Sequence, residues 1–254
     1  MREMDLNADL GESWGAWTMG NDAEMFDIVT SANVACGFHG GDPVVMHRTL
    51  TMARQKRVGV GAHPGYMDLW GFGRRRFVDD DPGQIEKVLI YQIGAIQAMA
   101  RAVGVPVTHF KVHGALANAT AVNASLAAAA ARAVLATDPG MIFLALPGTE
   151  QEHAARRAGL RIAREAYADR AYRSDGTLAA RDLPGAVLED AAEAAARMLG
   201  MVLDGKVATL DGTEIALEFD TICVHGDNPH AVGMARAVRD ALTGAGVRLR
   251  PMAR

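Results

Sequence analysis

Four histidines in this sequence stand where an apolar run gives way to a turn. They occur in the segments CGFHGGDP, GAHPG, KVHGAL and CVHGDNP, as His39, His63, His113 and His225. If these runs are parallel strands of one sheet, their C-terminal ends open on a single face, which is where ligands bind in barrels and open sheets alike. The pattern therefore predicts that four imidazoles meet at one rim, where the adjoining glycines let a ligand approach the backbone.

Carboxylates and an amide join this rim through the alternation of side chains along a strand. In DLNADL (5–10), Asp5, Asn7 and Asp9 lie on one side and the apolar residues on the other. A polar face on an interior strand is unfavourable unless its groups pair with one another or take part in chemistry. Glu12 follows in a glycine loop, where it either caps a turn or contacts a ligand.

A lysine and a further acid come from two later strands. In VTHFKVH (107–113), His109, Lys111 and His113 share a face, and in ICVHGD (222–227) so do His225 and Asp227. Histidine, carboxylate and lysine side chains support general acid–base hydrolysis, or metal-assisted hydrolysis if the imidazoles share an ion. The residues predict hydrolytic chemistry and leave these two versions open.

Motifs for several other chemistries are absent from the sequence. There is no G-x-x-x-x-G-K-[ST] loop for nucleotide phosphates, no dinucleotide-binding glycine fingerprint after a strand and no G-x-S-x-G nucleophile elbow. H-E-x-x-H and paired C-x-x-C motifs for zinc are missing as well. A serine or cysteine nucleophile therefore has no support.

Two polar loops supply further candidates. In REAYADRAYRSDG (164–176), Glu165, Asp169 and Arg170 fall within one predicted loop, and Arg170 could clamp a carboxylate or phosphate with two parallel hydrogen bonds. The alternative is a surface loop whose charges pair with one another. The segment WGFGRRRF (70–77), which contains Arg74, has the glycine and aromatic content of an active-site lid or an anion contact.

Short apolar runs alternate with helical patterns along the whole chain. We expect strands at 4–10, 32–36, 58–62, 107–112, 141–146, 160–163, 221–224 and 247–249. Helices are expected at 43–56, 82–103, 123–136, 150–158, 184–203 and 229–243, several of them rich in alanine. This order predicts a parallel α/β sheet, either doubly wound or closed as a barrel, in a single domain over residues 1–254. Asp211-Gly212 predicts one exception, a β-hairpin.

The composition is that of a water-soluble globular protein. Half of the 254 residues are hydrophobic, 22% are charged and the net charge is -4. The mildly acidic balance argues against a nucleic-acid partner, and the apolar runs are too short or too rich in alanine for a membrane span. The start of the chain has no signal-peptide core, so we expect a cytoplasmic protein. Cys36 and Cys223 lie in apolar runs and are expected as buried free thiols.

Six segments of the sequence, in this order, resemble the LamB/YcsF family. They are LNADLGES (6–13), SANVACGFHGGDP (31–43), GVGAHPGYMDLWGFGRR (59–75), HFKVHGALAN (109–118), EAYADRAY (165–172) and DTICVHGDNPHAV (220–232). Several are long and rich in rare residue types, and together they cover nearly the whole chain. The resemblance implies a distorted parallel β/α barrel, related to the barrels of glycoside hydrolases and carbohydrate deacetylases.

The resemblance also implies the activity of a 5-oxoprolinase, of which the family supplies the A subunit. That enzyme opens the lactam ring of 5-oxoproline (pyroglutamate) to give glutamate, with ATP as a cosubstrate that ends as ADP and phosphate. Two partner subunits, B and C, are implied as well. Phosphorylation of the lactam oxygen makes the ring carbon electrophilic, after which the reaction needs a base for water and donors for the developing charge. The oligomeric state stays open, and the chain could also form a homo-oligomer.

This chemistry gives roles to the candidate residues. Asp9 or Asp227 would be the base, Lys111 and His113 would stabilise charge, and Arg170 would bind carboxylate or phosphate. ATP would bind through the glycine turns at the strand ends or on a partner subunit. The residues predicted to bind substrate or phosphate are Asn7, Glu12, His39, His63, Arg74, Asn118, Glu165, Asp169, Arg170 and His225.

The sequence departs from the family pattern at two positions. The usual block reads Lys-Pro-His-Gly-Ala-Leu-Tyr-Asn, whereas Val112 stands here for the proline and Ala117 for the tyrosine. The first change affects backbone stiffness near the site. The second removes an aromatic hydroxyl and therefore bears on substrate fit.

Two further functions compete with this one. The first is a metal-dependent deacetylase or amidohydrolase acting on a small amide or sugar, with Asp9, His39 and His63 on a divalent ion (Mg, Mn or Zn). The second is a non-catalytic subunit that binds 5-oxoproline and presents it to its partners. ATP dependence and sensitivity to a chelator distinguish the first from a 5-oxoprolinase, and turnover by the isolated chain distinguishes the second.

Overall fold

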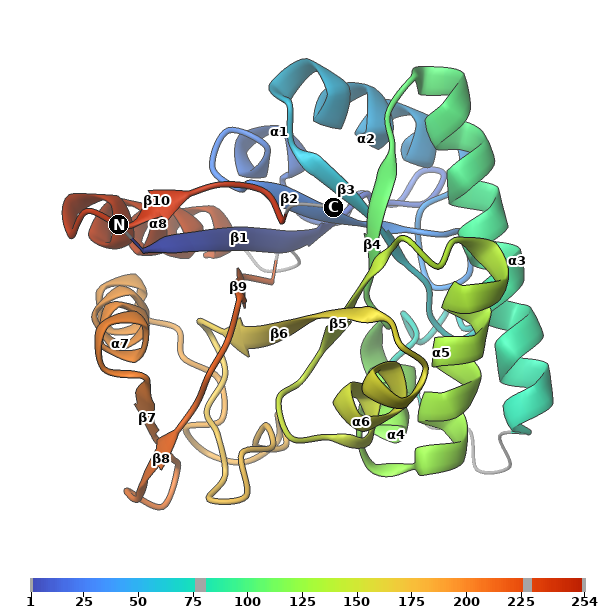
Figure 1. Ribbon diagram of the computed structural model, residues 1–254. Helices are drawn as coiled ribbons and strands as arrows, with labels where there is room; N and C mark the ends of the chain where they lie inside the picture. Colours follow the sequence, from blue (N-terminus) through green and yellow to red (C-terminus); the bar gives the residue numbers. More distant parts are fainter. Residues whose placement is uncertain (1, 76–80, 226–229, 253–254) are drawn as a thin grey trace.

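Seven parallel strands close into a barrel (Figure 1). The computed structural model describes residues 2–75, 81–225 and 230–252. The strands are arranged around the barrel in the order of the sequence, and the last one, β9, pairs with β1 to close it. Its strands are β1 (Glu3–Leu10), β2 (Ser31–Ala35), β3 (Gly59–His63), β4 (Val107–Phe110), β5 (Ile142–Ala145), β6 (Arg161–Tyr167) and β9 (Thr221–Cys223). The predicted distorted β/α barrel is therefore confirmed, and the doubly wound alternative is excluded.

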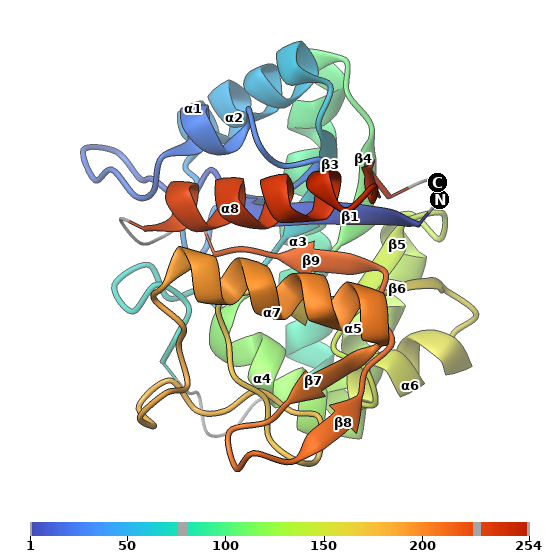
Figure 2. The same ribbon diagram turned by 90° about the vertical axis from the view of Figure 1, so that its left-hand side faces the viewer.

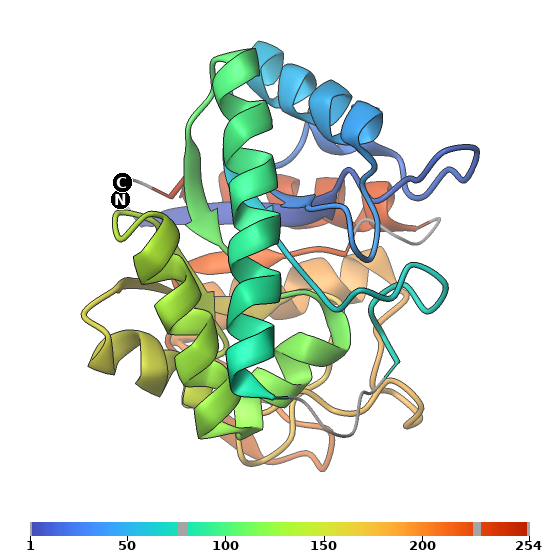
Figure 3. The same ribbon diagram turned by 90° about the vertical axis from the view of Figure 1, so that its right-hand side faces the viewer.

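Helices surround this barrel, as the two side views show (Figures 2 and 3). They are α1 (Asp22–Met25), α2 (Pro43–Lys56), α3 (Pro82–Val103), α4 (Gly114–Val122), α5 (Ala124–Thr137), α6 (Glu150–Arg157), α7 (Ala191–Asp204) and α8 (Ala231–Gly244). A short strand, β10 (Arg248–Leu249), pairs with the first residues of β1. The predicted hairpin is also present, as the antiparallel pair β7 (Lys206–Ala208) and β8 (Glu214–Ala216).

Helix starts were predicted best where an aspartate precedes a proline. Asp42 accepts hydrogen bonds from the amides of Val44 and Val45 at the start of α2, and Asp81 caps α3 in the same way. Proline fits the first turn because it lacks an amide that would otherwise be unpaired. Both helices have the bounds that the sequence predicts, 43–56 and 82–103.

Other boundaries were wrong. Strand β6 continues to Tyr167 instead of ending at residue 163, so Glu165 belongs to a barrel strand and not to a loop. The helix expected from residue 184 begins only at Ala191, where the Asp190 side chain accepts from the amide of Glu193. Helix α4 was not predicted at all. Residue 229, the expected start of the last helix, lies outside the described residues, and α8 begins at Ala231.

Polar side chains of β1, β2 and β4 occupy one part of the barrel interior and a small apolar cluster of Ile142, Leu144 and Ala163 another, whereas the main hydrophobic core lies between the barrel and its helices. On β1, Leu6, Ala8 and Leu10 are at most 1% exposed and belong to this outer core. The interior is crowded. Gly61 pairs with His109 of β4, and a Cβ on Gly61 would stand 2.1 Å from the His109 ring, so only glycine leaves room for that imidazole.

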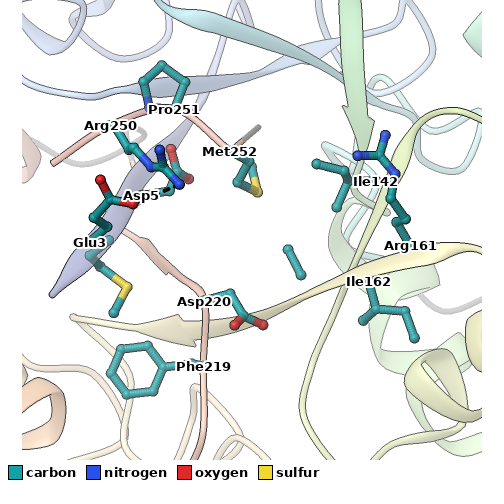
Figure 4. Close-up of a pocket in the computed structure, with 12 residues that line it drawn as sticks. Glu3, Asp5, Ile142, Arg161, Ile162, Phe219, Asp220, Arg250, Pro251 and Met252 are labelled. Carbon is teal, nitrogen blue, oxygen red and sulfur yellow. Dashed lines mark ion pairs between the residues drawn. The ribbon is translucent and has the colours of Figure 1, made fainter. Parts of the chain in front are cut away.

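A cavity of about 540 Å³ opens at the amino ends of the strands (Figure 4). Asp5 lies at its inner wall and accepts hydrogen bonds from the hydroxyls of Ser31 (2.6 Å), Thr30 (2.8 Å) and Thr221 (2.5 Å). This end is opposite to the predicted rim, because ligands of parallel barrels bind at the carboxyl ends of the strands.

Among the described residues, no single helix is long and apolar enough to cross a membrane. Helices α4 and α5 are long and apolar enough to span a membrane only if they are counted together, and the chain bends by 115° between them at Asn123. Most of the α5 residues that contribute to this apolar character face the protein core.

The buried Asp5 predicts a pH-dependent stability. Burial raises its pKa from 3.8 to about 6, so the folded carboxyl keeps its proton to a higher pH than the unfolded one. Stability is then lost as the pH rises from 4 to above 6, by about 3 kcal/mol at 1.36 kcal/mol per pKa unit. Denaturant unfolding of the wild type and of Asp5→Asn from pH 4 to 8 measures this. The expected outcome is a free energy of unfolding that falls in the wild type relative to the variant.

If the two proteins show parallel pH profiles, the pKa of Asp5 is not raised in the folded state.

Candidate active site

Three of the four predicted histidines form one cluster at the carboxyl ends of β2, β3 and β4. The rings of His39 and His113 are stacked with centroids 3.6 Å apart, and the His63 ring lies edge-on to His113 at 4.9 Å. Glu12, in the loop after β1, joins them, with Oε1 3.2 Å from Nε2 of His39 and 3.5 Å from Nδ1 of His113. All four side chains are buried. Glu12 therefore belongs to the histidine cluster at this rim.

A second cluster, which adjoins the first, is centred on Lys111. Its ammonium lies 3.0 Å from Oδ1 of Asp9, 2.9 Å from Oε1 of Glu165 and 3.1 Å from Sγ of Cys223. The two clusters meet at Asp9, because its other oxygen, Oδ2, lies 3.3 Å from Nε2 of His63. Asp9 is 8% exposed and Lys111 4%, so these charges interact with little screening by water.

The charge states in the second cluster follow from this arrangement. Burial alone would raise the pKa of Asp9, but its interactions with His63 and Lys111 outweigh this effect and hold the pKa well below its usual value. Burial would lower the pKa of Lys111, yet Asp9, Cys223 and Glu165 raise it well above the ordinary value. At neutral pH the pair is therefore a carboxylate and an ammonium. Lys111 can donate hydrogen bonds and stabilise negative charge, but it cannot act as a base.

The fourth histidine lies on the other side of Asp9. Nδ1 of His225 is 2.7 Å from Oδ2 of Asp169, and its ring stacks on Tyr167 with centroids 5.4 Å apart. Asp9, Cys223 and His225 each have an atom within 4.8 Å of the others. His225 therefore belongs to the same rim, and Asp169 orients it. Asp227, the alternative base, lies outside the described residues.

The remaining predicted residues lie around these clusters or apart from them. Asn7 is fully buried one layer below Asp9, where its amide donates to Thr221 Oγ1 at 2.7 Å. The guanidinium of Arg74 lies over the Phe72 ring at 5.0 Å. Arg170 donates to the carbonyl of Ala179 within its own loop. Arg170 is buried, and the two acids of the segment, Glu165 and Asp169, pair with Lys111 and His225, so the alternative of a surface loop with mutually paired charges is not what the structure has.

Asn118 is exposed on α4.

Sequence reasoning missed Asn33, which orients Asp9. Its amide donates to Asp9 Oδ1 (2.9 Å) and to Asn7 Oδ1 (2.7 Å), and its own oxygen lies 3.0 Å from Nε2 of His109. The signal was available, because alternation along SANVA puts Ser31 and Asn33 on one side of the strand. Cys223 was treated only as a buried thiol. Its contact with Lys111 depends on the closure between β9 and β1, which no local pattern reveals.

A loop covers the histidine cluster. The carbonyl of Phe72 accepts from Nε2 of His113 at 2.8 Å, and the Gly73 backbone is so close that a Cβ there would stand 2.8 Å from the His113 ring. Phe72 itself has φ +53°, an unfavourable value for a side chain of this size. At the outer rim, the exposed indoles of Trp17 and Trp70 are in contact, with centroids 5.6 Å apart. The loop therefore separates the histidine cluster from solvent on this side.

The departure at Val112 leaves the local backbone pairing intact. Two amides extend the strand pairing beyond β4, that of Lys111 to the Ala62 carbonyl (3.0 Å) and that of His113 to the Pro64 carbonyl (2.9 Å). The residue between them takes no part in these two bonds, so either proline or valine is compatible with them. Ala117 lies in α4, and its carbonyl accepts from the Gln151 side chain.

Known proteins similar to this chain cover its whole length. The sequence profile of the LamB/YcsF family matches residues 4–254. A protein of Rhodopseudomonas palustris (strain BisB5), named as the A subunit of 5-oxoprolinase, is 50% identical over 252 residues, which cover 99% of each chain. The crystal structure of a lactam utilization protein from Thermus thermophilus superposes with a TM-score of 0.94 at 49% identity, covering 98% of this chain and 100% of that one.

A more distant structure is similar in fold alone. The family 4 carbohydrate esterase from Streptomyces lividans superposes with a TM-score of 0.50 at 11% identity, covering 99% of this chain and 92% of that one. The expected relation to deacetylase-type barrels is thereby confirmed for the architecture of the fold. At this identity it carries no information about chemistry.

The close contact between Gly73 and the two stacked rings gives a test of the cover. Gly73→Ala would place its Cβ 2.8 Å from His113 and 2.9 Å from His39, so the loop or the rings must shift. Gly212→Ala is a matched control, since Gly212 has a similar positive φ but open space around it. We expect Gly73→Ala to be less stable than Gly212→Ala by about 1–3 kcal/mol in thermal or denaturant unfolding. Equal losses would show that the loop does not rest on the histidines.

Proposed function

Since this chain belongs to the LamB/YcsF family, we propose that it is the A subunit of a 5-oxoprolinase, a hydrolase that acts on a cyclic amide. The reaction converts 5-oxo-L-proline to L-glutamate and is coupled to hydrolysis of ATP to ADP and phosphate. The observation that carries the proposal is the buried Lys111 ammonium held between the carboxylates of Asp9 and Glu165, at 3.0 and 2.9 Å. This cluster lies at the end of the barrel where substrates of such folds bind.

The cluster provides what the opening of a lactam requires. An amide carbon is a poor electrophile, and transfer of a phosphoryl group to its oxygen corrects this. Water then attacks the ring carbon and the ring nitrogen leaves with a proton, which gives an acyl phosphate. A second water hydrolyses this acyl phosphate to the side-chain carboxylate of glutamate and inorganic phosphate. Lys111 is the donor for negative charge that develops on oxygen, where one well-placed donor contributes about 3 kcal/mol. Asp9 is ionised and acts as the base for water, and Asn33 holds it in place through a hydrogen bond of 2.9 Å.

The phosphates of ATP do not fit every helix start at this rim. At the start of α2, the Asp42 carboxylate already accepts from the amides of Val44 and Val45, and its charge repels a phosphate. The start of α4 is different, because it follows His113 directly and has no capping side chain, although the Gly73 carbonyl accepts from the amide of Ala115 at 2.9 Å. Arg74 lies beside it, with Cγ 3.7 Å from where a Cβ on Gly114 would stand. These features support phosphate binding near Arg74 and Gly114, together with groups from a partner subunit.

The assembly is part of the proposal. The relatives are named as A subunits, which describes a component of a complex with several subunits. We place this chain in a cytoplasmic complex with subunits B and C, in which the buried site opens to its substrate.

Turnover by the assembled complex tests the proposal directly. Glutamate release from 5-oxoproline is measured with and without ATP, and with and without subunits B and C. We expect release only when all are present. Lys111→Ala should lower the rate by a factor on the order of 100 or more, because it removes a charged donor from the site. Lys56→Ala is the control, since Lys56 is an exposed lysine whose ion pair with Asp27 lies away from the rim.

Folding of the variants must be checked, because Lys111→Ala leaves two buried carboxylates without their cation. Asp9→Asn keeps the shape and also tests the site, and we expect a comparable loss. Near-normal turnover in both variants would refute the assigned roles. Binding of 5-oxoproline with no turnover in the assembled complex would favour a subunit that only presents the substrate.

The histidine cluster supports a second candidate, a metal-dependent amidohydrolase or deacetylase. Three imidazoles and a carboxylate lie within 4.8 Å of one another, a donor set that binds divalent metal ions. Two of the three predicted ligands, His39 and His63, belong to this set, and Glu12 and His113 complete it. The third predicted ligand, Asp9, lies next to the set and is not part of it. Activity on a simple amide without ATP, abolished by a chelator, would favour this candidate over the first.

A further inference from the structure

Two backbone carbonyls fix the protons of two neighbouring imidazoles. Nδ1 of His63 lies 2.9 Å from the carbonyl oxygen of Lys111, and Nε2 of His113 lies 2.8 Å from that of Phe72. A carbonyl oxygen only accepts hydrogen bonds, so both of these nitrogens donate. In the neutral rings, the lone pairs are therefore on Nε2 of His63 and Nδ1 of His113.

Those two lone pairs face each other. The two nitrogens are 3.1 Å apart, and neither has a hydrogen to donate to the other. The atoms around them are acceptors as well, since Glu12 Oε1 lies 3.5 Å from Nδ1 of His113 and Asp9 Oδ2 lies 3.3 Å from Nε2 of His63. Without a positive charge among them, the two ring nitrogens and the carboxylate oxygens repel one another. A cation among these atoms, either a metal ion or a proton, would remove the repulsion.

We propose that Glu12, His39, His63 and His113 bind a divalent metal ion of the zinc type, an inference that rests on the proposed function only for the role of the ion. One donor atom from each residue lies within 4.8 Å of the others. Donors around tetrahedral zinc, at about 2.0–2.1 Å from the ion, are about 3.4 Å apart. Three separations among these residues, of 3.1, 3.2 and 3.5 Å, match this spacing, and all four donor atoms lie within 4.8 Å of one another.

The surroundings of the cluster agree with a metal site. Metal-bound histidines usually donate their second ring nitrogen to a carbonyl or carboxylate, which is the arrangement of His63 and His113. Imidazole-rich sites favour zinc and similar transition metals over magnesium. Nε2 of His39 faces Glu12 Oε1 at 3.2 Å, whereas Nδ1 is buried and has no partner among the described residues. Because the His39 ring is parallel to that of His113, it must turn to direct Nε2 at the same ion.

The neighbouring group of Asp9, Cys223 and His225 does not compete as a metal site. The Lys111 ammonium already lies 3.0 Å from Asp9 and 3.1 Å from Cys223, and its charge repels a metal ion. Burial also raises the pKa of the Cys223 thiol well above its usual value. The metal ion belongs to the histidine cluster. In the neighbouring cluster the Lys111 ammonium supplies the positive charge.

A divalent ion in this cluster would polarise a carbonyl or phosphoryl oxygen. It would do so beside Asp9, which is in contact with both the cluster and Lys111.

Metal binding can be measured without turnover. The full chain is stripped with a chelator, dialysed, and titrated with ZnCl2 and MnCl2 by calorimetry, with elemental analysis of the protein as purified. We expect one equivalent of Zn²⁺ per chain and a weakening of 10- to 100-fold or more in His113→Gln. His47→Gln is the control, because His47 is an exposed histidine on α2, and its affinity should equal that of the wild type.

Glu12→Gln keeps the size of the side chain, and it tests the site if His113→Gln does not fold. A wild type without zinc binding, or equal binding by wild type, His113→Gln and Glu12→Gln, overturns the proposal. The cation would then be a proton shared by His63 and His113. If the chain binds zinc but the complex releases no glutamate, only the 5-oxoprolinase function is overturned. If the complex releases glutamate but the chain binds no zinc, only the metal site is overturned.

Discussion

The hydrogen bonding of buried polar groups inside the barrel is the constraint on which the rest of the structure depends. Asn33 is its centre, since it donates to Asn7 and Asp9 and lies 3.0 Å from His109 as an acceptor. Buried polar groups are tolerated only when they are paired, and a network in which every member is satisfied is rigid. The barrel therefore delivers Asp9 to the rim in a fixed orientation. An apolar interior would have left that carboxylate without support.

Asp9 couples the two parts of the site. One of its oxygens lies 3.0 Å from the Lys111 ammonium and the other lies 3.3 Å from the His63 ring. A change of charge in either cluster therefore alters the electrostatic interactions of the other cluster through the Asp9 carboxylate. Phe72 and Gly73 lie over the histidine cluster, and the exclusion of water there strengthens the electrostatic interactions beneath them.

The sequence by itself determined the elements and the residues that they present. Aspartate followed by proline predicted the start of α2 and α3, and apolar runs ending in histidine predicted the strands and the rim. Alternation along β1 predicted that Asp5, Asn7 and Asp9 face inward together. These features are local, because capping, helix propensity and the two-residue period of a strand depend on neighbours in the chain.

Only the tertiary structure decided which of these residues meet. The sequence predicted four histidines at one rim, but the fold pairs His225 with Asp169 and puts the other three with Glu12. It also put Glu165 on a strand and brought Cys223 to Lys111. Such partners depend on the order and register of strands around a closed barrel and on where the loops cross its rim. These are set by packing across the whole chain, which no local pattern encodes.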